Sequence, residues 1–280
     1  MPFLTSAGVN LRYDRAGSGP MVLLVHAWAC NRTFWERQVH GLRDRFTLVT
    51  VDLRGHGESS HPQKGYGIGA MAGDLEALVR ALRVPAIAVV GWSLGGLVSI
   101  ELARRLGDRV RALGLVGVAA KVPAESDERR VEMAEGIERD FRGFVRTVAA
   151  GFLKEGAASP LYAWMVQEMQ KTPPHVAAAT FQAAVEFDAT PRLKALSLPV
   201  MIFHGRHDAL VPFAQSNDLA SAIKGAKVTA FEESGHAPAL EEPDAFNAAL
   251  AEFLSQPADA PATAAPSGKP AKKRARPRKS

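Results

Sequence analysis

The segment Gly91-Trp92-Ser93-Leu94-Gly95 limits the fold of this chain more than any other segment. It follows the apolar run 86–90 and precedes the helix-favouring stretch 96–105. The pattern predicts a buried strand, a sharp turn with Ser93 at its apex, and a helix that begins at Leu94. Glycines flank the serine because a strand and a helix that pass this closely leave no room for a Cβ atom. The turn would present the serine hydroxyl beside a helix N-terminus, which stabilises a developing oxyanion.

A serine hydroxyl is a weak nucleophile at neutral pH, so this reading requires a histidine base oriented by a carboxylate. Without them, the segment would be an ordinary strand-to-helix loop that contains a serine. Residues 199–203 predict a strand that leads into a loop with Asp208, and residues 227–231 predict one that leads into a loop with His236. Open α/β sheets place their chemistry beyond the carboxyl ends of strands. Asp208 and His236 are therefore the predicted partners of Ser93, and their order along the chain suits a strand-turn-helix nucleophile.

Other titratable residues are alternatives for these roles. Four histidines are interpreted as structural residues that bond to backbone groups of loops: His26, His56, His204 and His207. His207 adjoins Asp208, but neighbouring residues on an extended loop point in different directions. Asp52 and Asp188 remain alternatives for the carboxylate. The first follows an earlier strand, and the second ends a helical stretch.

The remaining segments predict alternating strands and helices. Predicted strands cover residues 3–6, 11–15, 21–25, 46–51, 86–90, 112–118, 199–203 and 227–231, and predicted helices cover 70–83 and 97–106. This alternation indicates an α/β fold with a mostly parallel sheet. Residues 121–188 interrupt it and predict several helices instead.

Two further segments accompany Ser93, Asp208 and His236. They are Leu-Leu-Val-His-Ala-Trp at 23–28 and Val-Asp-Leu-Arg-Gly-His-Gly-Glu-Ser at 51–59. With these motifs in this order, the chain resembles the α/β-hydrolase family over residues 3–254. The resemblance implies an eight-stranded, mostly parallel sheet with helices on both faces and a helical cap. It divides the chain into a core at 1–120, a cap at 121–190, a second core part at 191–255 and a tail at 256–280.

The resemblance also implies an oxyanion hole formed by the backbone N–H groups of Trp28 and Leu94. Ala27 departs from the glycine that the family usually carries at this position. Alanine enters positive φ only with strain. We therefore expect either an ordinary negative φ at Ala27 or a displaced oxyanion hole.

An apolar stripe runs through the predicted cap at helical spacing, at Phe141, Phe144, Val145, Val148 and Phe152. Most such stripes only pack a helix against its neighbours. Because this one belongs to a cap, Phe144, Val148 and Phe152, together with Trp28, are the predicted substrate-binding residues. Three arginines on a neighbouring face, Arg139, Arg142 and Arg146, are candidates to receive an anionic carrier. The segment 121–188 holds 8 basic and 11 acidic residues, which favours a solvated face instead.

The predicted reaction is hydrolysis of a small or medium carboxylic ester through an acyl-enzyme. No metal and no organic cofactor is implied. The motifs are similar to those of pimeloyl-carrier-protein methyl ester esterases, which makes an acyl carrier protein a candidate partner. They look equally like those of 3-oxoadipate enol-lactonases and general carboxylesterases, so an enol-lactone is the alternative substrate. Ser93 excludes the relatives of this fold that use an aspartate at the same turn, the haloalkane dehalogenases and epoxide hydrolases.

Composition is consistent with one catalytic domain in a reducing compartment. Of the 280 residues, 47% are hydrophobic, enough for a large buried core, and the apolar runs are strand-sized rather than membrane-spanning. Residues 1–10 lack the pattern of a secretory signal. Cys30 is the one cysteine, so the chain has no internal disulfide, and we expect a cytoplasmic enzyme.

The basic character of the chain belongs to its tail. Residues 1–268 hold 27 basic and 29 acidic groups, whereas residues 269–279 hold seven basic groups and no acidic one. From residue 256 onward the composition predicts disorder. The tail is a candidate for weak, non-specific contact with nucleic acid or another anionic surface. An alternative from another functional class stays open: the chain is a non-catalytic binding module, and this tail tethers it to nucleic acid or a granule.

Overall fold

The computed structural model describes residues 2–6, 8–121, 135–137 and 139–256. Part of the predicted cap and the predicted tail therefore lie outside the described residues.

The strands are β1 (Phe3–Ser6), β2 (Val9–Ala16), β3 (Met21–Val25), β4 (Thr47–Val51), β5 (Ile87–Trp92), β6 (Val110–Val116), β7 (Val200–Gly205) and β8 (Lys227–Phe231). The helices of the core are η1 (Arg32–Trp35), α1 (Glu36–Leu42), α2 (Ile68–Ala81), α3 (Leu94–Leu106), η2 (Gly107–Arg109), α8 (Thr190–Leu193), α9 (Ala214–Ala222), α10 (Pro238–Glu241) and α11 (Pro243–Ser255).

The strands form one eight-stranded sheet in the order β1-β2-β4-β3-β5-β6-β7-β8. The pairs β1/β2 and β2/β4 are antiparallel, and all other neighbours are parallel, which confirms the predicted mostly parallel α/β sheet. β3, β4 and β5 are buried along their whole length, as expected for central strands covered on both faces.

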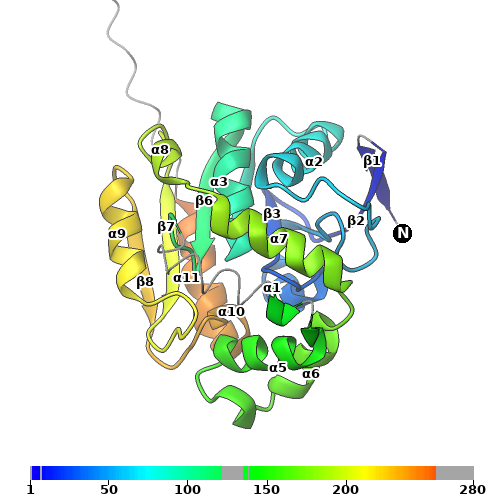
Figure 1. The fold of residues 1–280 in the computed structure, drawn as a ribbon. Helices are drawn as coiled ribbons and strands as arrows, with labels where there is room; N and C mark the ends of the chain where they lie inside the picture. The colour runs from blue at the N-terminus through cyan, green and yellow to red at the C-terminus, as the bar shows by residue number, and fades with distance from the viewer. Residues whose placement is uncertain (1, 7, 122–134, 138, 257–280) are drawn as a thin grey trace, which may run out of the picture.

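Consecutive residues of β5 show which helices cover each face of the sheet. A Cβ atom on Gly91 would meet Gly95 and Ser99 of α3. The Trp92 ring instead packs on Trp35, which in turn packs on Phe246 of α11. Because neighbouring side chains of a strand point to opposite faces, α3 and α11 lie on opposite sides of the sheet. Figure 1 shows the sheet between these helices.

Helices occupy the described part of the chain between β6 and α8: α5 (Phe141–Phe152), η3 (Gly156–Ala158), α6 (Tyr162–Met169) and α7 (Pro174–Glu186). In Figure 1, α5 and α6 lie together at the bottom of the view, and α7 runs across its middle. The Ala189 N–H donates to the Ala120 carbonyl at 2.8 Å, so the two ends of this insertion meet. On that basis we propose cap boundaries near residues 120 and 190. No helix of the described residues is both long and apolar enough to span a membrane.

Candidate active site

Ser93 stands between β5 and α3 with φ 53° and ψ −115°. A non-glycine residue in such a backbone conformation costs about 1–3 kcal/mol and is typical of functional sites. A Cβ atom on Gly91 would lie 2.3 Å from the Gly95 carbonyl oxygen, and one on Gly95 would lie 2.4 Å from the His26 carbonyl oxygen. The close approach of backbone to backbone therefore requires glycine at both positions, as the sequence predicts.

The two predicted oxyanion-hole residues lie on adjacent elements. Leu94 is the first residue of α3, so its N–H has no acceptor within the helix. Trp28 lies in the loop after β3, the strand that pairs with β5. Ala27 keeps a non-positive φ, and the left-handed residue of this loop is Ala29, with φ 55°. Of the two expectations for Ala27, the ordinary backbone conformation is the one found.

His236 and Asp208 meet beyond the ends of β8 and β7. His236 Nδ1 lies 2.7 Å from Asp208 Oδ2. Asp208 Oδ1 accepts the N–H groups of Leu210 at 2.9 Å and Val211 at 2.7 Å. Both side chains are buried. A bond from Nδ1–H to the carboxylate leaves Nε2 as the basic atom of the imidazole.

Asp208 is held in its ionised form. Burial alone would raise the pKa of its carboxyl, but the His236 ring, hydrogen bonding from His204 and the Val211 N–H together lower that pKa well below its usual range. His204 Nε2 lies 3.0 Å from Asp208 Oδ2 and 2.8 Å from the Val211 carbonyl oxygen. His204 therefore ties the loop to the backbone, as interpreted from the sequence, and also contacts the carboxylate, which the sequence did not indicate.

The His236 ring is enclosed on several sides. The Phe152 ring packs edge-on against it, with centroids 4.7 Å apart and planes at 89°. A Cβ atom on Gly117, just beyond β6, would lie 2.9 Å from His236 Nδ1. Trp92 Nε1, one residue before Ser93, donates to the His236 carbonyl oxygen at 2.8 Å. These contacts place the imidazole next to the Ser93 turn.

No hydrogen bond joins the Ser93 hydroxyl to the His236 ring in the part of the chain that the structure describes. The contact that the structure does provide is the neighbouring Trp92–His236 bond. Bonds between a nucleophile and its base are often long in the absence of substrate and shorten when it binds. The structure thus ties the His236 backbone to the side chain of Trp92, the residue before Ser93.

Glu241 supports the histidine loop, a role that the sequence did not reveal. Its Oε2 accepts the Gly235 N–H at 2.8 Å, and its Oε1 accepts the Lys154 N–H at 2.7 Å. Burial raises the pKa of Glu241. The side chain thereby joins the end of the cap helix α5 to the residue before His236. Only tertiary contacts identify Glu241, whereas Gly117 had one local signal, a glycine directly after a buried strand.

The histidines and carboxylates that were alternatives to His236 and Asp208 lie away from these two residues or make other contacts. His26 accepts the Leu53 N–H at its Nε2, 3.0 Å away, and its Nδ1 lies 2.8 Å from the Ala27 carbonyl oxygen. His207 is exposed. The Asp188 carboxylate accepts the Thr190 N–H and pairs with Lys121.

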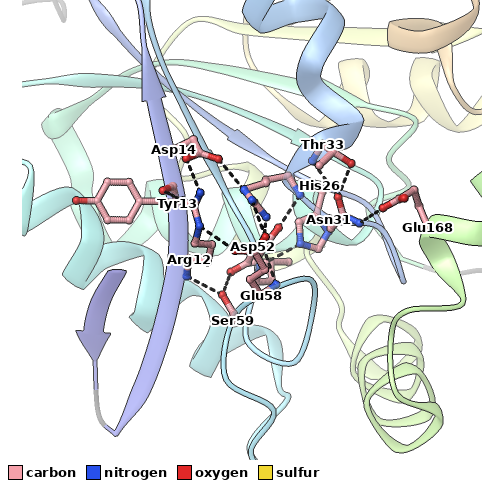
Figure 2. A network of polar contacts seen from close by, with 12 residues as sticks. Arg12, Tyr13, Asp14, His26, Asn31, Thr33, Asp52, Glu58, Ser59 and Glu168 are labelled. Carbon is pink, nitrogen blue, oxygen red and sulfur yellow. Dashed lines mark hydrogen bonds and ion pairs between the residues drawn. The ribbon is translucent and has the colours of Figure 1, made fainter. Parts of the chain in front are cut away.

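Residues 26–31, between β3 and η1, contain the predicted oxyanion-hole residue Trp28 and are named the oxyanion loop on that basis. Asp52 belongs to a charged network next to this loop, shown in Figure 2. Arg32 donates from its guanidinium to Asp14 at 2.7 Å, Asp52 at 2.8 Å and Glu58 at 3.0 Å. Burial alone would lower the pKa of Arg32, but these carboxylates raise it. The network fixes η1, which follows the oxyanion loop, to β2 and to the loop after β4.

Stability should fall in mild acid because of two buried histidines. Burial lowers the pKa of His26 to about 4, and burial together with the charge on His26 lowers the pKa of His56 to about 3. Below about pH 6.5 these two histidines therefore bind protons in the unfolded chain, whereas in the folded chain they stay neutral until the pH is much lower. We expect a constant free energy of unfolding above about pH 6.5 and a decline toward pH 4, measured by urea titration.

The control for this prediction is His56→Gln, which removes one of the two groups. Its free energy of unfolding should decline less steeply than that of the wild type over the same range. Burial raises the pKa of Asp52 and of Glu241, which acts in the opposite direction, but both carboxyls are present in the wild type and in His56→Gln alike. Parallel curves for the wild type and His56→Gln would show that His56 does not carry this effect.

The predicted substrate-binding residues differ in their surroundings. Phe144 is partly buried on α5, and its ring packs edge-on against Trp28 with centroids 5.9 Å apart. Val148, one helical turn later, is also partly buried. Phe152 is 2% exposed and lies against His236. A cavity of about 390 Å³ lies elsewhere, lined by Arg32, His40, Arg43 and neighbours, and includes no triad residue.

Comparisons with known proteins show which family shares this sequence and fold. A model of the alpha/beta hydrolase fold matches residues 20–243. The pimeloyl-[acyl-carrier protein] methyl ester esterase of Vibrio vulnificus is 30% identical over 263 residues, covering 88% of this chain and 99% of the relative. An esterase from Exiguobacterium antarcticum superposes with a TM-score of 0.86 at 25% identity, covering 91% of this chain and 99% of that one. The enol-lactonase from Burkholderia xenovorans superposes with a TM-score of 0.84 at 26% identity, covering 91% and 100%.

Proposed function

Because this chain belongs to the α/β-hydrolase fold family, whose similar members are esterases and lactonases, we propose that it hydrolyses a small or medium carboxylic ester through an acyl-enzyme on Ser93. The observation that carries the proposal is the strained Ser93 turn beside a buried His236–Asp208 pair. A backbone held in this conformation has no evident structural purpose, since an ordinary strand-to-helix loop needs no positive φ at a serine.

The proposed reaction uses the base and the oxyanion donors in sequence. His236 Nε2 takes the Ser93 proton as the hydroxyl oxygen attacks the ester carbonyl, and the imidazolium is stabilised by Asp208. The N–H groups of Trp28 and Leu94 bind the oxyanion. The tetrahedral intermediate then expels the alcohol, which takes the proton from His236. In the second half, His236 removes a proton from water, and the water oxygen attacks the acyl-enzyme. The bond from the acyl carbon to Ser93 Oγ then breaks, Oγ takes the proton back from His236, and the acid is released.

For the substrate, the first candidate is a methyl ester on a carrier protein, supported by the relative that acts on such an ester. The alternative is an enol-lactone, supported by the structural similarity to an enol-lactonase. We propose that Trp28, Phe144, Val148 and Phe152 border the acyl site. The Phe144 and Trp28 rings touch each other next to the proposed oxyanion donor, and Phe152 touches the base.

The acyl chain length should reveal this pocket. Each methylene that the cap side chains enclose should add about 0.8 kcal/mol, or about fourfold in kcat/KM, until the pocket is full. Phe144→Ala should change the chain-length profile rather than lower all rates equally. The measurement is a series of p-nitrophenyl esters from acetate to octanoate, extended to a pimeloyl methyl ester and an enol-lactone.

Two outcomes of this series would contradict different parts of the proposal. A uniform loss in Phe144→Ala, together with a lower melting temperature, would make Phe144 only a packing residue. An absence of turnover across the whole ester series would favour the non-catalytic alternative, a binding module tethered by its basic tail. Phe141→Ala is a suitable control because Phe141 belongs to the same stripe but is not proposed to border the acyl site.

We propose further that the protein is cytoplasmic and that an acyl carrier protein is its candidate partner. Arg139, Arg142 and Arg146 are exposed and are the candidates to receive that carrier, although the charge balance of residues 121–188 favours a solvated face for them. The single cysteine, Cys30, is buried and free, which is compatible with a reducing compartment.

The tail is proposed to make weak, non-specific contact with nucleic acid or another anionic surface, because it holds seven of the basic residues and no aromatic residue. Deletion of residues 256–280 should leave ester hydrolysis and the melting temperature unchanged and abolish salt-sensitive retention on DNA. A melting temperature lower by several degrees would contradict the view of the tail as an appendage.

A further inference from the structure

The cap contacts the oxyanion loop at Trp28, the proposed donor, and at residues that follow it. The Trp28 indole donates from Nε1 to the Ala177 carbonyl oxygen of α7 at 2.9 Å. The Thr172 hydroxyl, which is buried, donates to the Ala29 carbonyl oxygen at 3.1 Å. Ala29 is the residue of this loop with positive φ. The cap therefore binds both the Trp28 side chain and the strained peptide that follows it.

A third contact comes from Asn31, shown in Figure 2. Asn31 Oδ1 accepts the Thr33 N–H at 2.9 Å and the Thr33 hydroxyl at 2.6 Å. This leaves the amide nitrogen to face the cap, where Asn31 Nδ2 donates to Glu168 Oε2 of α6 at 3.0 Å. Glu168 Oε1 accepts from Lys171 at 2.5 Å, so the carboxylate is fixed from its other side.

The next residue, Arg32, fixes the far end of the same loop to the core. Its guanidinium contacts three carboxylates, and its N–H donates to Asp52 Oδ1 at 2.7 Å. One end of the oxyanion loop is thus held by β3 and the other by the Arg32 network. Between them, the His26 ring and the Cys30 N–H contact the Ala27 carbonyl oxygen, and the cap binds Trp28, Ala29 and Asn31. The Trp28 and Ala29 contacts that follow Ala27 therefore come from the cap.

We propose that Glu168 and Thr172 are positioning residues for the oxyanion hole: from the cap, they hold residues 28–31 so that the Trp28 N–H is directed at the developing oxyanion. This inference rests on the proposed esterase function. It assigns the cap a part in the chemical step in addition to its part in enclosing the substrate.

Reciprocal substitution tests the Asn31–Glu168 bond. Asn31→Asp keeps an oxygen that can accept from Thr33 but places a carboxylate against Glu168, and the two like charges should separate. We expect kcat to fall about 10- to 100-fold with little change in KM. This loss is smaller than the loss caused by complete removal of an oxyanion donor, because the Trp28 N–H is misdirected and not removed. The double variant Asn31→Asp/Glu168→Gln restores a donor and an acceptor, so kcat should return to within about threefold of the wild type.

Matched controls separate this effect from a general change in cap charge or stability. Glu186→Gln removes a carboxylate from α7 that bonds to Gln182 and not to the oxyanion loop, so its kcat should equal that of the wild type. Thr172→Val should lower kcat, whereas Thr147→Val, which removes a hydroxyl bonded within α5, should not. These threonine variants also test the proposal if Asn31→Asp fails to fold.

A second readout reports on the oxyanion hole itself. Butylboronic acid forms a tetrahedral adduct with an active serine, so its inhibition constant should rise in Asn31→Asp and Thr172→Val in proportion to the loss of kcat. Equal kcat in Asn31→Asp and its double variant, or unchanged inhibition constants, would overturn the positioning role. If instead Ser93→Ala retains the wild-type rate, the proposed esterase function fails, whatever the cap variants do.

Discussion

Ser93→Ala and His236→Ala are each expected to lower kcat/KM by at least about 10⁴-fold, and the double variant should lose little more. The reason is that the two side chains act on one proton: without the base the hydroxyl is a weak nucleophile, and without the hydroxyl the base has nothing to activate. Asp208→Asn should leave a larger remnant, because it disturbs the orientation of His236 and not the chemistry itself. The measurement is steady-state hydrolysis of p-nitrophenyl butyrate, with far-ultraviolet circular dichroism to check folding.

Losses that multiply independently in the double variant would contradict this assignment of the pair. His207→Ala is the matched control, because His207 adjoins Asp208 but is exposed. It should retain the wild-type rate.

Gly117→Ala is expected to lower the activity of the enzyme substantially without unfolding it. Gly117 has φ 56°, and a Cβ atom there would lie 2.9 Å from both Nδ1 and Cε1 of His236. The imidazole would have to move by a few tenths of an ångström or more, and misplacement of this kind costs about 10- to 100-fold in rate. The measurement is kcat/KM together with the melting temperature.

The control is Gly107→Ala at the end of α3. Gly107 has φ 53°, close to that of Gly117, but a Cβ atom there meets nothing within 4 Å. Both variants should lose about 1–2 kcal/mol of stability from the left-handed backbone, and only Gly117→Ala should lose activity. Equal activities in the two variants would show that the His236 ring tolerates the added methyl group.

Much of the fold could be predicted because each catalytic candidate follows a strand with a clear apolar pattern. The strand predicted at residues 227–231 is found at those residues. The helix after Ser93 begins at Leu94, as the turn motif predicts, three residues before the stretch 97–106 that the helical pattern predicts. The helix predicted at 70–83 is α2 at Ile68–Ala81, a shift of two residues. Helix ends depend on contacts that sequence patterns do not contain.

The site could be predicted less completely, for physical reasons that differ between residues. Local sequence could not decide which residue of the oxyanion loop has positive φ, and the structure places it at Ala29 rather than Ala27. Helical spacing grouped Phe152 with Phe144 and Val148, yet spacing alone cannot show that the end of α5 packs against His236. Glu241, His204 and Arg32 act through partners far along the chain, which only the fold brings together.

The most direct test of the central claim is to trap the acyl-enzyme. A p-nitrophenyl ester is mixed with the protein, the reaction is quenched with acid within the first turnover, and peptides are mapped by mass spectrometry. We expect one acyl group per chain, on the peptide that contains Ser93, and none in Ser93→Ala. Rapid turnover by a protein that carries no adduct, or an adduct on another residue that forms and decays at the turnover rate, would contradict the account.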